Sequence, residues 1–212
     1  MTTTSLTVGA EFPFKYIAGD PALDLVNTVD WTSRGPENER LTDFSRLVSW
    51  AEEAGVVSAR SAATLRKRAA TKPGEAAAAH HYALETRAAL ARLFGRMAAG
   101  RAGSRDLHDF NRLLGPPLEQ MRLLPAPTPG GQELQLGWEE RENRLESVVW
   151  PVLWSAARLL TSDEATQIRV CGGEDCGWMY VDRSRNGLRR WCQMETCGTR
   201  EKSRRRAAGG KR

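Results

Sequence analysis

The chain has 212 residues, of which 41% are hydrophobic and 27% charged, and its formal net charge is +5 at pH 7. This length and composition can fill a hydrophobic core, and they exclude a collagen-like, coiled-coil or wholly disordered chain. No apolar run approaches the roughly 18 residues of a membrane-spanning helix. The first residues show no basic flank before an apolar stretch, so we expect a cytoplasmic protein without a membrane partner.

Apolar residues recur at helical spacing along most of the chain, and start and stop signals bound each stretch. Asp20 before Pro21 is typical of a helix start, because the Asp side chain accepts hydrogen bonds from the first free N–H groups. Either Thr42 or Asp43 can begin the second helix in the same way, and Gly115 with the two prolines after it is expected to stop the fifth. The predicted helices cover residues 20–31, 42–55, 58–70, 75–99, 104–114 and 145–160.

Shorter features lie between these helices. Residues 32–36 are typical of a loop. Met121–Leu124 and Glu133–Trp138 flank a turn rich in proline and glycine, so we expect them to pair as a β-hairpin. The helix predicted at residues 145–160 is the most apolar of these and should form the core. Pro151 inside it predicts a kink or a late start.

The composition changes near residues 161–164, where acidic residues precede a segment rich in Cys, Gly and Arg. Residues 169–212 carry 12 Lys+Arg and 5 Asp+Glu, a net charge of +7, whereas residues 1–168 carry −2. Such asymmetry is typical of a polyanion-binding module attached to a separate body. We therefore predict a mainly α fold, with a helical domain and small β-hairpin over residues 1–164 and a C-terminal four-cysteine module.

All four cysteines lie in the basic segment, as two C-x4-C pairs: Cys171 with Cys176, and Cys192 with Cys197. A tetrahedral zinc site takes two ligands from each of two turns, and two equal spacings supply them. The alternatives are two disulfides, which reducing compartments disfavour, and redox-active thiols, which usually have the C-x-x-C spacing. We favour one structural Zn2+, which four protein ligands leave without an open position for catalysis.

The segment from Arg169 to Arg200 resembles the bacterial CGNR-type zinc finger. It contains an Asp-x-Ser-x-Asn turn at residues 182–186 and an Arg-Arg-Trp-Cys run at residues 189–192. Where that family has Cys-Gly-Asn-Arg, this chain has Cys-Gly-Thr-Arg, with Thr199 at the third position.

Residues 22–30, Ala-Leu-Asp-Leu-Val-Asn-Thr-Val-Asp, are similar to the start of the ABATE-type domain that accompanies this finger. Together the two resemblances imply a stress-induced transcriptional regulator. They imply an ABATE-like domain over residues 1–164 and a CGNR-like finger with a basic helix over residues 165–206, and we expect a flexible tail at residues 207–212.

Basic residues cluster on both sides of the second cysteine pair. A helix is expected from about Cys192, and its spacing places Arg200 and Arg204 on one face. Four thiolates around zinc carry about −2, so roughly +5 of the module's charge remains for phosphate contacts. DNA is the expected partner and RNA is less favoured, although such charges also simply aid solubility. The candidate nucleic-acid residues are Arg183, Arg185, Arg189, Arg190, Arg200, Lys202, Arg204, Arg205 and Arg206.

Asn27 lies on the apolar side of the first predicted helix, where a buried amide must find hydrogen-bond partners. It forms either a structural bond to a neighbouring element or part of a pocket for a small-molecule ligand. No hydrolase or nucleotide-binding motif is present, so we do not expect an enzyme. We expect a DNA-binding regulator whose helical domain senses a ligand or forms a homodimer. The alternative is a protein–protein adaptor or a thiol-based redox switch.

Overall fold

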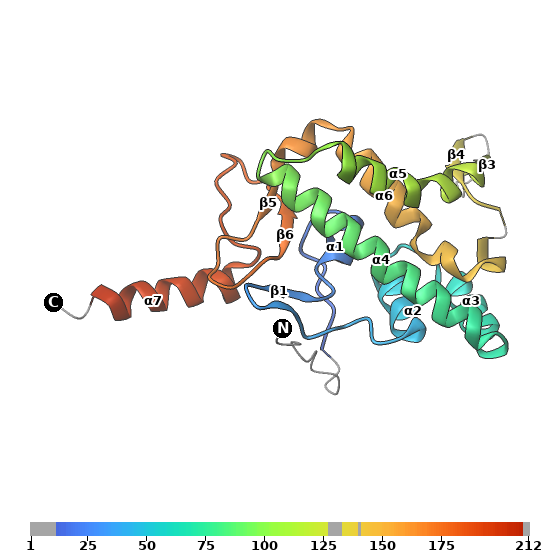
Figure 1. The fold of residues 1–212 in the computed structure, drawn as a ribbon, viewed down its shortest axis with the longest axis horizontal. Helices are drawn as coiled ribbons and strands as arrows, with labels where there is room; N and C mark the ends of the chain where they lie inside the picture. Colours follow the sequence, from blue (N-terminus) through green and yellow to red (C-terminus); the bar gives the residue numbers. More distant parts are fainter. Residues whose placement is uncertain (1–11, 127–132, 140, 210–212) are drawn as a thin grey trace.

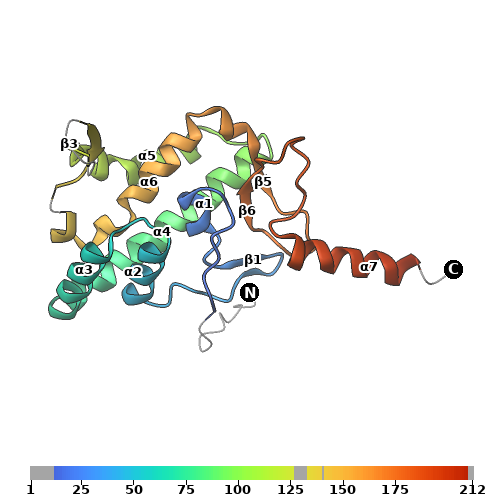
Figure 2. The same cartoon turned by 180° about the vertical axis from the view of Figure 1, so that it is seen from behind.

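The computed structural model describes residues 12–126, 133–139 and 141–209. Within these residues the chain is mainly helical and carries three small two-stranded antiparallel sheets, which confirms the predicted fold class. The first six α-helices form the body, and the last, α7, projects away from it (Figures 1 and 2).

Helix α1 (Pro21–Val26) starts where the sequence predicts, with the Asp20 side chain accepting from the Ala22 N–H at 2.8 Å. The predicted end at residue 31 is wrong. After α1 the chain turns and forms a hairpin of β1 (Asp30–Thr32) and β2 (Gly35–Glu37), so the loop expected at residues 32–36 is the turn and second strand of this hairpin.

The early end of α1 is accompanied by a side-chain hydrogen bond. The indole of Trp31 donates to the Val26 carbonyl at 2.8 Å, which satisfies an oxygen left free at the helix end. Such contacts override helix propensity, which is a weak preference.

Helix α2 (Phe44–Glu53) is capped by Asp43, whose side chain accepts from the Arg46 N–H at 2.8 Å. Gly55 after it has a φ of +68°, a conformation that favours glycine. Helix α3 (Ala59–Thr71) begins at the Ser58 cap, as predicted.

Helix α4 (Pro73–Ala98) is the long Ala-rich helix, and α5 (Ser104–Glu119) follows it. The predicted stop of α5 at Gly115 is wrong, because the helix continues through both prolines. Pro117 cannot donate to the Leu113 carbonyl, but the Tyr82 hydroxyl of α4 donates to that oxygen at 2.9 Å. A neighbouring helix therefore supplies the hydrogen bond that proline removes.

The expected β-hairpin is confirmed as β3 (Arg122–Pro125) paired with β4 (Leu134–Gly137). Short 3-10 turns, η1 (Arg141–Asn143) and η2 (Leu145–Val149), lead into α6. Helix α6 (Trp150–Leu160) has Pro151 in its first turn, so proline marks a late helix start.

The core of the body lies where α1, α4 and α6 meet, and its side chains are almost fully buried. After the 3-10 turn η3 (Asp163–Gln167), strand β5 (Ile168–Val170) pairs with β6 (Met179–Val181) at the edge of this core. Successive side chains of a strand point to opposite faces. Accordingly Met179 and Val181 join the core of the body, and Tyr180 joins a second cluster around the cysteines.

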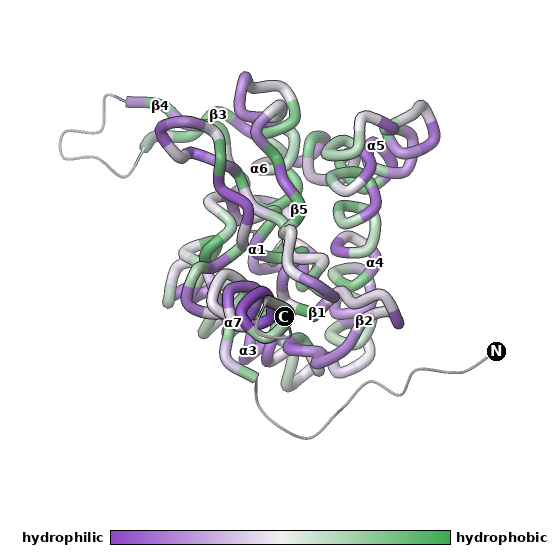
Figure 3. Tube along the Cα trace, turned by 90° about the vertical axis from the view of Figure 1, so that its left-hand side faces the viewer, coloured by the Kyte–Doolittle hydropathy of each residue, from purple (hydrophilic) through white to green (hydrophobic). Residues whose placement is uncertain are grey.

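A short π-helical turn, η4 (Met194–Gly198), leads into α7 (Thr199–Gly209). Residues 207–209, expected in a flexible tail, continue this helix, and residues 210–212 lie outside the described residues. Figure 3 shows α7 as a predominantly hydrophilic helix. In the part of the chain that the structure describes, no helix combines the length and apolarity needed to span a membrane.

Candidate metal centre and nucleic-acid interface

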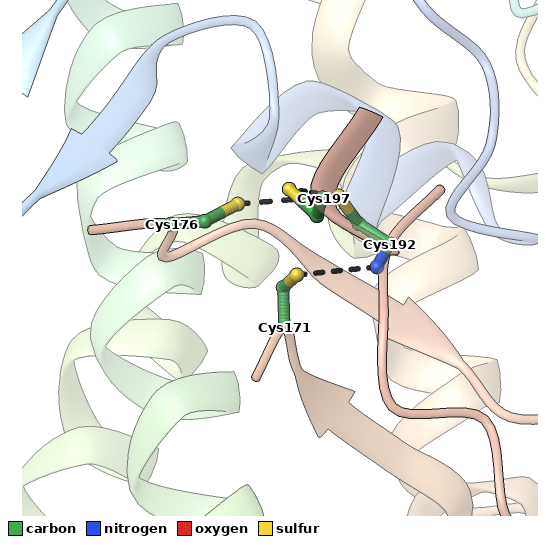
Figure 4. A group of neighbouring side chains, drawn as sticks. All are labelled: Cys171, Cys176, Cys192 and Cys197. Carbon is green, nitrogen blue, oxygen red and sulfur yellow. Dashed lines mark hydrogen bonds between the residues drawn. The ribbon is translucent and has the colours of Figure 1, made fainter. Parts of the chain in front are cut away.

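The four cysteine side chains converge on one point (Figure 4), and their Sγ atoms all lie within 4.8 Å of one another. The Sγ of Cys192 is 3.9 Å from that of Cys176 and 3.6 Å from that of Cys197. With Zn–S bonds of about 2.3 Å, a tetrahedral site has sulfur–sulfur distances of about 3.8 Å. The cluster therefore has the dimensions of a site for one Zn2+.

Two segments far apart in the sequence supply the ligands. Cys171 directly follows β5 and Cys176 ends the turn before β6, while Cys192 precedes η4 and Cys197 lies within it. A methyl group at Gly173 in the first turn would lie 3.2 Å from the Sγ of Cys197, so a side chain there would press against a ligand sulfur.

The turn that carries Cys197 is also tightly packed. A methyl group at Gly198 would lie 2.2 Å from the Sδ of Met194, so a larger residue would displace the half-exposed Met194 side chain. Thr199, which stands where the CGNR tetrapeptide has Asn, donates its hydroxyl to the Met194 carbonyl at 3.1 Å. This threonine therefore closes the turn just ahead of α7.

The sulfur atoms share protons unequally. The neighbouring Cys176 and Cys192 side chains, together with the N–H groups of Cys192 and Gly173, lower the pKa of the Cys171 thiol. The proximity of Cys171 in turn raises the pKa of the Cys176 and Cys192 thiols. Because adjacent thiolates repel each other, four of them need a cation between them, which is the condition that Zn2+ fulfils.

Asn27 joins the body to the finger. Its Nδ2 donates to the Met179 carbonyl at 2.8 Å and its Oδ1 accepts from the Met179 N–H at 2.9 Å. The residue is 2% exposed, so this amide satisfies a buried strand edge of β6. The structural hydrogen bond, one of the two roles expected from the sequence, accounts for the position of Asn27. No contact among the described residues supports the ligand-pocket role.

The β1–β2 hairpin braces the zinc-binding loop, a feature that the sequence did not reveal. The Gly177 N–H donates to the Trp31 carbonyl at 2.7 Å, and a methyl group at Gly177 would lie 2.6 Å from the Cβ of Trp31. Beside it, the Trp178 indole donates to the Val29 carbonyl at 3.2 Å, and the Ser33 N–H donates to Asp175 at 2.6 Å. The sequence feature that belongs to this contact is Gly177, the glycine after Cys176. Its partner, Trp31, could not be predicted from the sequence.

Two of the nine candidate basic residues hold the finger together. Arg189 lies over the ring of Tyr180, 4.1 Å from its centroid, and donates to three backbone carbonyls, including that of Ile17. Arg183 pairs with Glu164 and donates to the Gly19 carbonyl at 2.8 Å. Both guanidinium groups tie the finger to the segment before α1.

Two more of the candidates are paired within α7. Arg204 and Arg205 both donate to Glu201, which is 8% exposed, and Arg204 also reaches Glu174 at 3.3 Å. These bonds lower the pKa of Glu201 and raise that of Arg204.

The other five candidates are exposed, and within the described residues none of them has a carboxylate partner. Arg190 lies over the ring of Trp191, 5.1 Å from its centroid. The five residues are Arg185, Arg190, Arg200, Lys202 and Arg206.

The aromatic residues of the finger are mainly structural. Trp178 is 6% exposed and Tyr180 is fully buried, while Trp191 packs at the edge of the same cluster. They form the finger's core, which leaves little free ring surface for stacking on bases.

The fold and the site together define a helical protein with a four-cysteine zinc finger at its C-terminal end. Residues 167–208 match the family described as "CGNR zinc finger". Residues 19–163 match the ABATE family, described as "Putative stress-induced transcription regulator". The chain therefore belongs to the ABATE family and carries a CGNR zinc finger, with four cysteines suited to one Zn2+. The family description names a regulator of transcription and not an enzyme. Among curated proteins, no match to the chain was found.

Proposed function

We propose that the protein is a DNA-binding regulator of transcription in which the zinc finger positions α7 on the duplex. The observation that carries this proposal is the exposure of α7. The helix projects away from the body (Figure 1). Every side chain from Lys202 to Ala208 is exposed. A basic helix whose side chains are exposed beyond its first turn suits the major groove of DNA.

The zinc site explains how so short a helix is held. Isolated helices shorter than about 12–15 residues are marginal in water, and α7 has 11 residues. Cys197 fixes the turn before it, and the bonds from Glu201 to Arg204 and Arg205 join its first and second turns. Zinc binding thus supports the geometry of the proposed DNA contact without touching DNA.

We assign the basic residues to different roles from the contacts that each of them makes. Arg200, Lys202 and Arg206 of α7 and Arg185 and Arg190 of the finger loop are the groups we assign to DNA. Guanidinium groups suit both phosphates and guanine edges, so Arg200 and Arg206 are the first candidates for base contacts. Arg204 and Arg205 could contact DNA only if their hydrogen bonds to Glu201 were shared with a phosphate or broken. Arg183 and Arg189 act as positioning residues.

The first test measures binding of the zinc-loaded protein to a random duplex by fluorescence anisotropy at several salt concentrations. Each phosphate contact contributes a slope of roughly −0.9 to log K against log salt. The double variant Arg200→Ala/Arg206→Ala should bind more weakly, with a slope shallower by about 1 to 2. Lys67→Ala, which removes an exposed charge on the distant α3, is the matched control and should bind like the wild type. Absence of binding at low salt would rule out this function.

We further propose that the helical body acts as a sensor or a dimerisation unit, in a protein located in the cytoplasm, where it has access to the chromosome. Selection of bound sequences from a random duplex library tests both the specificity and the assembly. An enriched inverted repeat, together with a dimer in sedimentation velocity, would support dimerisation. An unenriched library would leave only non-specific phosphate binding.

A further inference from the structure

A cleft between the β1–β2 hairpin and the finger leads to the metal centre. It has a volume of about 320 Å3. Trp31 and Glu37 line it from the body, and Thr196 and Arg200 line it from the finger. The floor is formed by Cys176, Cys192 and Cys197. A small molecule that enters this cleft therefore meets the zinc-binding sulfurs.

The four sulfurs differ in their protection. Cys171 accepts hydrogen bonds from the Gly173 and Cys192 N–H groups at 3.4 and 3.2 Å, which reduces the availability of its lone pairs. Cys192 and Cys197 are 3% and 6% exposed. Cys176 is the partly exposed member of the cluster. With zinc bound all four sulfurs are thiolates, so exposure decides which one is oxidised first, and this favours Cys176.

We propose that Cys176 is a modification site for hydroperoxides that enter through this cleft. The thiolate sulfur attacks one oxygen of hydrogen peroxide, the O–O bond breaks, and the other oxygen takes a proton from solvent and leaves as water. Sulfur is oxidised by two electrons and the peroxide is reduced, which leaves a sulfenic acid on Cys176.

The neighbouring sulfur completes the reaction. The Sγ of Cys192 lies 3.9 Å from that of Cys176 and attacks the sulfenic acid. An S–S bond forms, the S–O bond breaks, and the hydroxide takes a second proton to leave as water. Overall, two thiolates, one peroxide and two protons give one disulfide and two waters. Only Cys171 and Cys197 would then remain to hold a bound Zn2+, too few ligands to retain it.

The consequence reaches α7, because Cys197 fixes the turn that precedes it. Loss of zinc releases this turn, so oxidation frees the basic helix from its base. The oxidation itself does not depend on the proposed DNA binding, because it is measured by zinc and by the disulfide.

The experiment treats the zinc-loaded full chain with hydrogen peroxide. Released zinc is followed with a chromogenic chelator, and the disulfide is located by peptide mass spectrometry after alkylation. We expect release of the bound zinc together with a disulfide between Cys176 and Cys192. Retention of zinc, or first oxidation at another cysteine, would overturn the proposal.

A matched pair of variants tests the choice of sulfur. Cys176→His keeps a zinc ligand, since three Cys and one His form a common site, but it removes the thiol on the cleft. Zinc release should slow at least about fivefold. Glu195→His places the same imidazole at a neighbouring exposed position that is not a ligand, and this variant should release zinc as fast as the wild type. Both are first checked for bound zinc.

Should either variant fail to hold zinc, limiting N-ethylmaleimide on the zinc-loaded wild type decides the same question. Alkylation first at Cys176 supports the proposal, and alkylation first elsewhere overturns it.

A second pair tests the route of entry. Thr196→Phe places a ring in the cleft, whereas Glu195→Phe adds the same ring to the neighbouring exposed position outside it. We expect slower zinc release by peroxide for Thr196→Phe alone. Equal rates for the two variants would show that the peroxide does not enter by this cleft.

Discussion

Asn27 shows how much a single residue contributes to the joint between body and finger. Its amide pairs with both backbone groups of Met179, 152 positions away in the sequence. The position of Asn27 on an apolar helix face indicated that a partner was needed, because a buried amide is rarely left unpaired. The identity of the partner could not be inferred, because it is a strand edge brought there by tertiary packing.

Replacement Asn27→Ala should therefore destabilise the protein by about 1–3 kcal/mol, since the Met179 N–H and carbonyl remain buried without partners. The free energy of unfolding in urea measures this loss. Asn111→Ala, at an exposed position of α5, should change stability by no more than about 0.5 kcal/mol. Equal effects of the two substitutions would contradict the role given to Asn27.

At the level of the helices and strands, capping residues predicted the starts well and the ends less well. The Asp20, Asp43 and Ser58 caps are all observed, because a cap depends on residues within one turn. At the end of α1 and where α5 passes through two prolines, a side chain outside the helix donates to a backbone carbonyl: Trp31, five residues beyond Val26, and Tyr82 on the neighbouring α4. Capping rules therefore failed where a side chain outside the helix supplied a missing hydrogen bond.

This explanation predicts that Tyr82→Phe weakens the last turns of α5. The ring remains in place, but the Leu113 carbonyl loses its donor, at a cost of about 0.5–1.5 kcal/mol. Hydrogen exchange should accelerate at the amides of residues 118–120, while the middle of α4 remains protected. Unchanged exchange at the end of α5 would show that the hydroxyl does not support the helix.

For the whole molecule, the sequence predicted a helical body and a zinc module but not how closely they are joined. The spacing of the cysteines was sufficient to predict the four zinc ligands, because zinc coordination strongly constrains the type and spacing of its ligands. The basic residues were less informative, since charge alone does not distinguish Arg189, bonded within the finger, from the exposed Arg200. That distinction requires knowledge of how the side chains pack in the folded protein.

Removal of zinc by a chelator should release α7 and leave the helices of the body intact. The physical reason is that α7 is short and packs on no core, whereas α2 to α5 bury apolar faces. Limited trypsin digestion should accelerate after Arg204 to Arg206 and remain unchanged after Lys67 on α3. Faster cleavage of both regions would contradict this prediction, because it would show that the metal stabilises the entire chain.

The close approach of Gly177 to Trp31 has a consequence for the modularity of this protein. Two family descriptions meet between residues 163 and 167, which suggests two units that could be exchanged freely. The contacts cross that junction, because the zinc-binding loop rests on β1 and β6 rests on Asn27. A finger grafted onto another scaffold would need residues 27–37 with it, and shuffling at the junction alone would separate a loop from its support. The unit that can be inherited or engineered intact is therefore discontinuous in the sequence.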